Sequence, residues 1–220
     1  MMDLSIIIPF SPQEDHLGEI LSDLEKIPPI VNFEIILVGE SDGPIPENSK
    51  KLFVRSDLGR AVQLNKGGEM AKGRFLLFLH ADSRVSSYDF RLFYQTQTKC
   101  PNGLTYFNLK FYPNSKKMGL NEIGAKFRSN ILKLPFGDQG LGLSKETFSK
   151  LEGFPLIPLG EDIGLVCRAR KRGIFLVNNG ANIYTSARKY EKNGWIKTTL
   201  IHIYYSIKLY LSFWFGAKTI

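Results

Sequence analysis

Residues 74–84 read Arg74-Phe-Leu-Leu-Phe-Leu-His-Ala-Asp-Ser-Arg84 and carry the clearest structural signal in the chain. The five apolar residues from Phe75 to Leu79 form a short continuous run, which is typical of a strand buried on both faces of a sheet. The run ends in His80-Ala-Asp82, at the position where open α/β sheets bind their ligands. An imidazole and a carboxylate at this spacing could hold a divalent cation, and through it a diphosphate. The alternative is an ordinary turn whose aspartate caps the next helix.

The charge balance favours an anionic partner. The 220 residues include 29 Lys and Arg against 21 Asp and Glu, a formal net charge of +8. Such a balance suits a phosphorylated small molecule, a nucleic acid or an anionic lipid surface. The most basic tract, Arg168-Ala-Arg-Lys-Arg172, is typical of the last turn of a helix, so we do not expect nucleic acid as the partner. Two cysteines without metal-type spacing, and no signal peptide, predict a reduced cytoplasmic protein.

The chain up to Leu79 alternates between strand and helix patterns. We expect the first helix to start at Ser11-Pro-Gln-Glu14, where Ser is the N-cap and Glu occupies the capping-box position. A second helix should start at Arg60, although Gly67-Gly68 weakens its middle. Strands are predicted over 4–8, 33–38, 52–55 and 75–79. This alternation predicts right-handed βαβ units on a parallel sheet, and neither GxGxxG nor a Walker loop is present.

The second half of the chain is less regular, and it shows no internal repeat or linker, so we predict a single domain over residues 1–220. We expect a glycine-rich polar loop over 135–140, and Ser144 should cap a short helix ending at Leu151. The remaining helices are predicted over 88–98, 121–132 and 161–172, and the remaining strands over 103–111, 141–144, 175–177 and 182–184.

Several fragments, in their order and spacing, resemble the family 2 glycosyltransferases. These fragments are Ser5-Ile-Ile-Ile-Pro9, the acidic turn at Glu40 and Asp42, Gly59-Arg-Ala61 with Gln63 and Asn65, Ala71-Lys-Gly73, His80-Ala-Asp82 and Glu161-Asp162. The resemblance covers roughly residues 4–195. It implies an α/β protein of the GT-A fold, with a mostly parallel central sheet flanked by helices, that transfers a hexose from a nucleotide-diphosphate sugar to an acceptor that the sequence does not identify.

The chain is most similar to a bacterial subgroup, the selenodomain-associated or arsenosugar-biosynthesis-type glycosyltransferases. The fragments that carry this likeness are Pro135-Phe-Gly-Asp-Gln-Gly140, Gly153-Phe-Pro155 and Thr185-Ser-Ala-Arg188 with Trp195. Two features depart from the family pattern. His80 stands where most relatives have the first acid of Asp-x-Asp, and the acidic turn from Val38 to Gly43 is shortened. The first departure affects the geometry and identity of the metal. The second affects which nucleobase the pocket selects.

The resemblance implies a role for each site residue. Asp82 would bind Mn²⁺ or Mg²⁺, and His80 is either a second ligand, a donor behind the ligands or a core histidine. Asp162 would be the general base of an inverting displacement, with Glu161 orienting the site. The alternative for these two acids is a purely structural role, because acids are favourable at a helix N-terminus. The donor's nucleotide would contact Pro9, Phe10, Ser11, Glu40, Asp42, Arg60 and Asn65, and the donor sugar or acceptor would face Asp138 and Gln139.

Two other functions remain open at this stage. Nucleotidyl transfer on a related fold would favour a glycine-rich basic loop after the first strand, whereas this chain has Pro9-Phe-Ser-Pro-Gln-Glu14 there. A non-catalytic nucleotide- or carbohydrate-binding protein is compatible with the missing first acid at His80. The sequence alone does not separate this last alternative from an enzyme.

The segment 199–217 is unusually aromatic and should form a C-terminal helix. One helical stripe does not include all its apolar residues, because Ile201, Tyr205, Leu209 and Phe213 point away from it. We expect this helix either to dock on the core or to lie at a membrane interface as a peripheral contact, on the inner face of the membrane. Its apolar length is marginal for a membrane span. The stripe itself consists of Leu200, Ile203, Ile207, Leu211 and Trp214.

Overall fold

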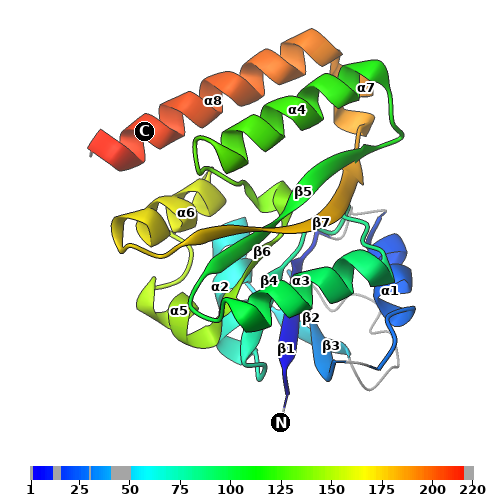
Figure 1. Cartoon of the computed structure of the whole chain (residues 1–220), viewed down its shortest axis with the longest axis vertical. Helices are drawn as coiled ribbons and strands as arrows, with labels where there is room; N and C mark the ends of the chain where they lie inside the picture. Colours follow the sequence, from blue (N-terminus) through cyan, green and yellow to red (C-terminus); the bar gives the residue numbers. More distant parts are fainter. Residues whose placement is uncertain (1, 12–15, 30, 41–50, 216–220) are drawn as a thin grey trace.

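A seven-stranded sheet runs through the computed structural model, which describes residues 2–11, 16–29, 31–40 and 51–215 (Figure 1). The strand order is β3-β2-β1-β4-β6-β5-β7. Strands β1 to β4 are mutually parallel, and β6 lies antiparallel between β4 and β5, while β5 pairs parallel with β7. The strands are β1 (Leu4–Pro9), β2 (Phe33–Gly39), β3 (Lys51–Arg55), β4 (Phe75–Phe78), β5 (Leu104–Tyr112), β6 (Leu141–Ser144) and β7 (Leu176–Ser186).

Helices cover both faces of this sheet (Figure 1). On one face α1 and α3 pack against β1, β2 and β4, and on the other face α2, α5 and α6 do so. This three-layer arrangement buries both sides of the central strands, as the α/β architecture requires. The helices are α1 (Leu17–Glu25), α2 (Arg60–Met70), α3 (Ser87–Lys99), α4 (Lys116–Asn130), α5 (Lys145–Lys150), α6 (Glu161–Lys171), α7 (Arg188–Asn193) and α8 (Trp195–Phe215).

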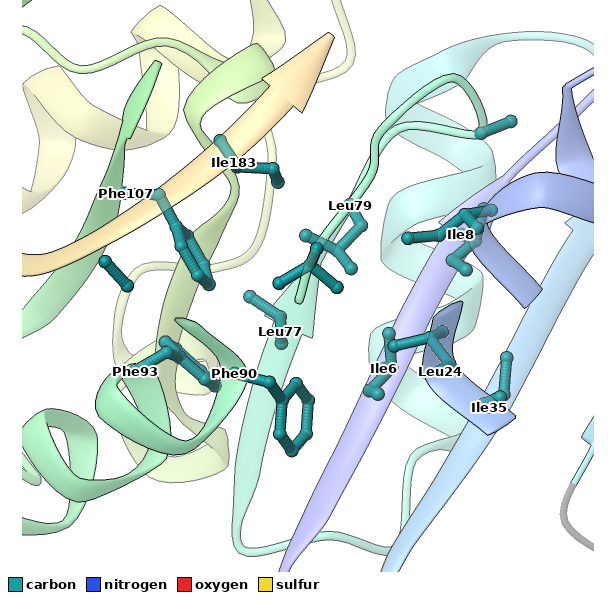
Figure 2. Packing of buried hydrophobic residues seen from close by; sticks show 14 of the residues in the cluster. Ile6, Ile8, Leu24, Ile35, Leu77, Leu79, Phe90, Phe93, Phe107 and Ile183 are labelled. Carbon is teal, nitrogen blue, oxygen red and sulfur yellow. The ribbon is translucent and has the colours of Figure 1, made fainter. Parts of the chain in front are cut away.

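The central strands divide their side chains between two hydrophobic cores. Ile6 and Leu77 point into the first core, where they meet Leu24 of α1 and Phe90 of α3 (Figure 2). Their sequence neighbours on β1 and β4 point into the second core, which α2, α5 and α6 close. All four residues of β4 are buried, so the continuous apolar run of this strand is explained by burial on both faces. The predicted buried strand is therefore confirmed.

Helix α2 lies close to the sheet because two glycines remove side chains from its inner surface. An ideal Cβ on Gly67 would lie 2.4 Å from Cγ2 of Ile7 on β1, and one on Gly68 would lie 2.4 Å from Cε1 of Phe148 on α5. Larger residues would push the helix outward. The glycines that weaken the helix signal in the sequence are thus required by packing, and α2 continues through them to Met70.

Several element predictions differ from the structure: helix α4 begins at Lys116, five residues before the predicted start at 121, and the short helix α7 was not predicted. Helix α1 runs from Leu17 to Glu25, whereas the sequence predicts a helix start at Ser11-Pro-Gln-Glu14. Residues 12–14 of that predicted cap lie outside the described residues. Strand β7 is a single strand of 11 residues, whereas the sequence pattern predicts two short ones. Its register with β5 shifts between Tyr106 and Asn108, and this irregularity breaks the alternation of polar and apolar residues.

The C-terminal helix α8 docks on the core through one face. Leu209 is buried and packs against Gly160, and Phe213 packs against Gly164 of α6. The opposite stripe is exposed, and Leu200 is 60% accessible to solvent. Of the stripe predicted from the sequence, the side chain of Trp214 lies outside the described part. Among the helices that the structure describes, none combines the length and the apolar character that a bilayer crossing requires.

Candidate active site

Several of the residues singled out in the sequence lie where β1, β2 and β4 end. The parallel register places Pro9 beside Val38, so the loops that follow β1 and β2 leave the sheet side by side. Gln63 of α2 joins these two strand ends, because its side-chain amide donates hydrogen bonds to the carbonyl oxygens of Phe10 and Val38, at 3.1 and 3.3 Å. This edge of a parallel sheet is the usual place for a ligand.

A compact cluster of charged residues lies at this edge. Arg60, at the start of α2, forms an ion pair with Glu161, at the start of α6, with 3.1 Å between Nε and Oε1. Asp162 and His80 share a small cavity with this pair, of about 10 Å³, which is about the space of one water molecule. The structure therefore brings together four residues that come from three distant segments of the chain.

Asp162 is held by two backbone donors. The N–H of Gly137 donates to Oδ2 at 2.5 Å, and the N–H of Ile163 donates to Oδ1 at 2.8 Å. The carboxylate also lies in the first turn of α6, where the helix dipole favours negative charge. Its orientation is fixed by backbone atoms and not by a flexible side chain, which suits a group that must meet a reacting atom in one geometry.

Glu161 differs from its neighbour in burial and partner. It is only 7% exposed, and its carboxylate faces the guanidinium of Arg60. Burial raises the pKa of Glu161, the adjacent charge of Asp162 raises it further, and Arg60 opposes both effects. Glu161 is therefore suited to holding Arg60 in place, whereas Asp162, with the greater exposure, is the acid available to a substrate.

The loop that carries Gly137 is anchored by Arg128 of α4, a residue that sequence reasoning missed. Its guanidinium donates to the carbonyl oxygen of Leu134 at 2.8 Å and lies 3.2 Å from the centre of the Phe136 ring. Gln139 donates to the carbonyl oxygen of Phe107 at 2.9 Å and is 1% exposed. Gln139 therefore fixes the loop from inside the protein and does not face the donor or acceptor as predicted.

Asp138 is the second acid of this loop, and its position is unusual. Its Oδ1 atom is buried and has no hydrogen-bond partner within the described residues. Burial raises the pKa of Asp138. The positive charge of Arg128 lowers this pKa, whereas the negative charges of Asp162 and Asp82 raise it further. Leaving a buried carboxylate oxygen unpaired costs stability, which is typical of a group retained for binding or chemistry.

His80 and Asp82 follow β4 as predicted, and both lie at the cluster. The imidazole Nδ1 is 4.0 Å from Oδ1 of Asp82, and the hydroxyl of Thr185 donates to Oδ2 at 3.4 Å. Burial, followed by the positive charge of Arg60, holds the pKa of His80 well below its ordinary value of about 6.5, so the ring is neutral at pH 7. A neutral imidazole and a carboxylate are suitable ligands for Mn²⁺. Within the described residues they belong to no group of three or more such ligands, so a metal here would take its other ligands from substrate and water.

A cleft of about 730 Å³ opens between the end of β2, β3 and α2. Glu40 lines it, as predicted for the nucleotide side, and so does Asn65, but the amide of Asn65 is engaged with the backbone of Phe154 through two hydrogen bonds of 2.8 Å. Phe10 is only 9% exposed and packs edge-on against Phe53, so its ring belongs to the core. The cleft is lined by Glu40, Arg55, Ser56, Asp57, Leu58, Val62, Asn65, Lys66, Glu69 and Leu156.

The remaining nucleotide-side residues have varied positions. Pro9 is buried at the end of β1, and Ser11, two residues later, is exposed. Asp42 lies outside the described residues. A second cleft, of about 570 Å³, is lined by Asp82 together with Arg188 and Lys192 of α7. This second cleft is strongly basic, whereas the cleft beside Glu40 is lined by both acidic and basic side chains.

Comparison with solved structures identifies the scaffold. A crystal structure of S. aureus TarS 1–349 matches with a TM-score of 0.66 and 16% identity, covering 84% of this chain and 60% of that one. A second crystal structure of S. aureus TarS matches with a TM-score of 0.64 and 16% identity, covering 84% and 37% respectively. TarS is a GT-A glycosyltransferase. The fold is the GT-A fold. No protein-family profile and no curated protein matches the sequence.

The predicted GT-A fold is thus confirmed, although this chain spans 60% or less of the length of the TarS chains. On the GT-A scaffold nine of the sequence-predicted residues fall into two sets. One set meets at the sheet edge, where its charged groups face one another, and the other is engaged in the core or with the backbone. The first set is Arg60, His80, Asp82, Asp138, Glu161 and Asp162, and the second is Phe10, Asn65 and Gln139.

Proposed function

We propose that this protein is a metal-dependent, inverting glycosyltransferase that moves a sugar from a nucleotide-diphosphate sugar to a hydroxyl acceptor. The observation that carries the proposal is the position of Asp162. Backbone N–H groups hold its carboxylate beside the Arg60–Glu161 pair, at the same sheet edge as His80 and Asp82. The GT-A fold is consistent with this reaction but does not by itself establish it.

In the proposed reaction Asp162 is the general base. The acceptor oxygen attacks the anomeric carbon of the sugar from the side opposite the nucleotide, while its proton passes to the carboxylate of Asp162. The new carbon–oxygen bond forms as the bond to the diphosphate oxygen breaks, and the nucleoside diphosphate leaves with that electron pair. A single displacement of this kind inverts the anomeric centre. The backbone N–H groups of Gly137 and Ile163 keep the base in position, while Glu161 holds Arg60 beside it and does not exchange the proton.

Asp82 and His80 would hold Mn²⁺ or Mg²⁺. The ion would neutralise the charge that develops on the departing diphosphate. The chemistry of the residues fits this role, because Asp82 is a partly exposed carboxylate and His80 is held neutral. Since the two atoms are 4.0 Å apart and no third protein ligand is grouped with them in the described part of the chain, binding should require the nucleoside diphosphate as well.

The nucleotide would lie in the cleft beside Glu40, with its phosphates directed towards Asp82. Glu40 would accept hydrogen bonds from the base or ribose, the exposed hydroxyl of Ser11 would contact the same part of the donor, and the guanidinium of Arg60 suits a phosphate. Pro9 shapes the adjoining strand end.

Placement in family 2, and in the bacterial selenodomain-associated or arsenosugar-type subgroup, remains our proposal. So does a cytoplasmic location, which the free Cys100 and Cys167 support.

A thermal-shift screen of UDP-, GDP-, ADP- and CDP-sugars, with and without Mn²⁺, tests the function. A donor that binds should raise Tm in a concentration-dependent way, and only when the metal is present. The Asp82→Ala variant should lose this metal-dependent shift. Release of nucleoside diphosphate from the donor would then establish catalysis. Release of pyrophosphate instead would indicate nucleotidyl transfer, and binding without turnover in the presence of varied acceptors would indicate a non-catalytic protein, so either result would contradict the proposal.

A further inference from the structure

Helices α4 and α8 together present a large exposed apolar surface, which we call the α4/α8 face. On each helix, these residues point away from the core, opposite the buried Ala125 of α4 and Leu209 of α8. Their side chains are between 45% and 67% exposed. Contiguous exposed apolar surface of this kind marks an interaction site. The face consists of Leu120, Ile123, Phe127 and Ile131 on the α4 side, and Leu200, Ile203, Tyr204, Ile207 and Leu211 on α8.

The two helices lie side by side along one flank of the molecule (Figure 1). Asn121, near the start of α4, accepts hydrogen bonds from Trp195 at 3.3 Å and Thr199 at 3.4 Å, near the start of α8. Further along, Arg170 of α6 donates both to the carbonyl oxygen of Leu132 and to the hydroxyl of Tyr210. These links hold the helices together at two levels, so their outward sides form one continuous surface.

The charges around the α4/α8 face are almost all positive. Helix α8 contains Lys197 and Lys208 and no acidic residue. Helix α4 contains one acid, Glu122, which is largely buried and forms an ion pair with Lys110 at 2.8 Å. Apolar side chains flanked by lysines, with tyrosine at the boundary, are the pattern of helices that lie in the interface of an anionic membrane. The exposed lysines along the face are Lys116, Lys117, Lys126, Lys133, Lys197 and Lys208.

We propose that the α4/α8 face docks this protein onto an anionic lipid surface, with both helices lying in the plane of the interface. A second copy of the chain is a poorer occupant. A two-fold interface would bring this basic face against an equally basic copy, so that lysines such as Lys126 and Lys208 would meet positive charge without exposed acids of the two helices to pair with them. Anionic lipid headgroups supply the opposite charge, while acyl chains accept the apolar side chains. This proposal does not depend on the reaction at the sheet edge.

The docking surface also lies close to the catalytic elements. Leu209, on the inner side of α8, contacts Gly160, which directly precedes Glu161 and Asp162. An ideal Cβ on Gly160 would lie 2.5 Å from Cδ1 of Leu209, so α8 covers the loop that leads into α6. A protein docked through the outer side of α8 would therefore hold the start of α6 near the lipid surface.

Co-sedimentation with vesicles tests the proposal. The full chain is mixed with vesicles of phosphatidylglycerol and phosphatidylcholine, or of phosphatidylcholine alone, at low and high salt. We expect sedimentation with the anionic vesicles only, weakened by salt. Lys126→Gln should lower the partition coefficient about fivefold. Ile207→Glu combined with Phe127→Glu should lower it by at least about 10- to 100-fold, because these side chains would otherwise be buried in the interface.

Phe175→Glu is the matched control. Phe175 is 80% exposed and lies outside the face, so its replacement should leave binding unchanged. Thermal melting of each variant confirms that it is folded. Failure of the wild-type chain to sediment with anionic vesicles would overturn the proposal, and so would an equal loss of binding in Phe175→Glu. A dimer seen by sedimentation velocity that dissociates in the double variant, without vesicle binding, would assign the face to self-association and would equally overturn it.

Discussion

Gly137 is predicted to be essential to the position of the proposed base, and its replacement by alanine tests this without touching a charged group. An ideal Cβ at this position would lie 2.9 Å from Nε2 of His80 and 3.1 Å from Oδ2 of Asp162. Ordinary contacts begin at 3.4 Å, so His80 must retreat by about 0.5 Å and the Asp162 carboxylate by about 0.3 Å. Gly137 does not have a positive φ, so alanine adds no backbone strain.

The expected result is a clear fall in kcat accompanied by only a small fall in Tm. Overpacking should cost about 1 kcal/mol, or about 2–4 °C in Tm for a chain of this size. Because a displacement of about 1 Å at a reacting group can cost about 100-fold in rate, a shift of about 0.3 Å in the Asp162 carboxylate should lower kcat by about 3- to 10-fold. The assay is the rate of nucleoside diphosphate release with a donor found in the thermal-shift screen, measured alongside Tm.

Gly124→Ala is the control for this experiment. Gly124 lies in α4 with no atom within 4 Å of its ideal Cβ, so alanine there should stabilise the helix by about 1 kcal/mol and leave kcat unchanged. Full activity in Gly137→Ala, despite a fall in Tm, would refute the reasoning, since the Asp162 carboxylate would then be free to move without consequence. A loss of donor affinity equal to the loss of rate would instead make the loop a binding element.

Three further predictions concern burial and charge. Asp138→Asn should be more stable than the wild type at pH 7, because burial raises the pKa of Asp138 and destabilises only the ionised carboxylate. This difference in the free energy of unfolding should vanish as the pH falls to about 4, and urea unfolding at several pH values measures it. Below pH ~6.5 the wild type should lose stability relative to His80→Gln, by up to about 1.4 kcal/mol in the free energy of unfolding per pH unit. The reason is that His80 takes up a proton in the unfolded chain, whereas the folded ring, with its lowered pKa, does not. A stability difference that does not change with pH would contradict this. Leu209→Ala should cost about 2–3 kcal/mol in urea unfolding, whereas the exposed Leu211→Ala should cost less than about 0.5 kcal/mol; equal effects would show that α8 is not docked.

The central strands and the acids at the start of α6 could be predicted from the sequence, because their signals are local. Phe75 to Leu79 is a continuous apolar run, and β4 is buried on both faces accordingly. Glu161-Asp162 stands at the start of a helical pattern, and α6 begins at Glu161. Burial on two faces and charge at a helix N-terminus are both properties that neighbouring residues determine, so they are visible without tertiary information.

The roles of Arg128 and Asn65 could not be predicted, because both depend on contacts between distant segments. Arg128 reads as an ordinary solvated arginine in a helix, yet its guanidinium lies against Phe136 and anchors the loop of Gly137. Asn65 matches the family pattern, but its amide pairs with the backbone of Phe154, 89 residues later. Nothing in the local sequence distinguishes a side chain that binds a ligand from one that forms hydrogen bonds with a loop.

The most direct test of the account is the replacement of Asp162 by asparagine, which keeps the shape of the side chain but does not accept the acceptor's proton. Transfer should fall by about 10²–10⁴-fold, while calorimetric titration with the nucleoside diphosphate and Mn²⁺ should give nearly the wild-type affinity. Glu146→Gln, at the exposed start of α5, is the matched control and should change neither quantity. Full transfer by Asp162→Asn would contradict the assignment of the base, and a loss of nucleotide affinity that matches the loss of transfer would make Asp162 a binding residue instead.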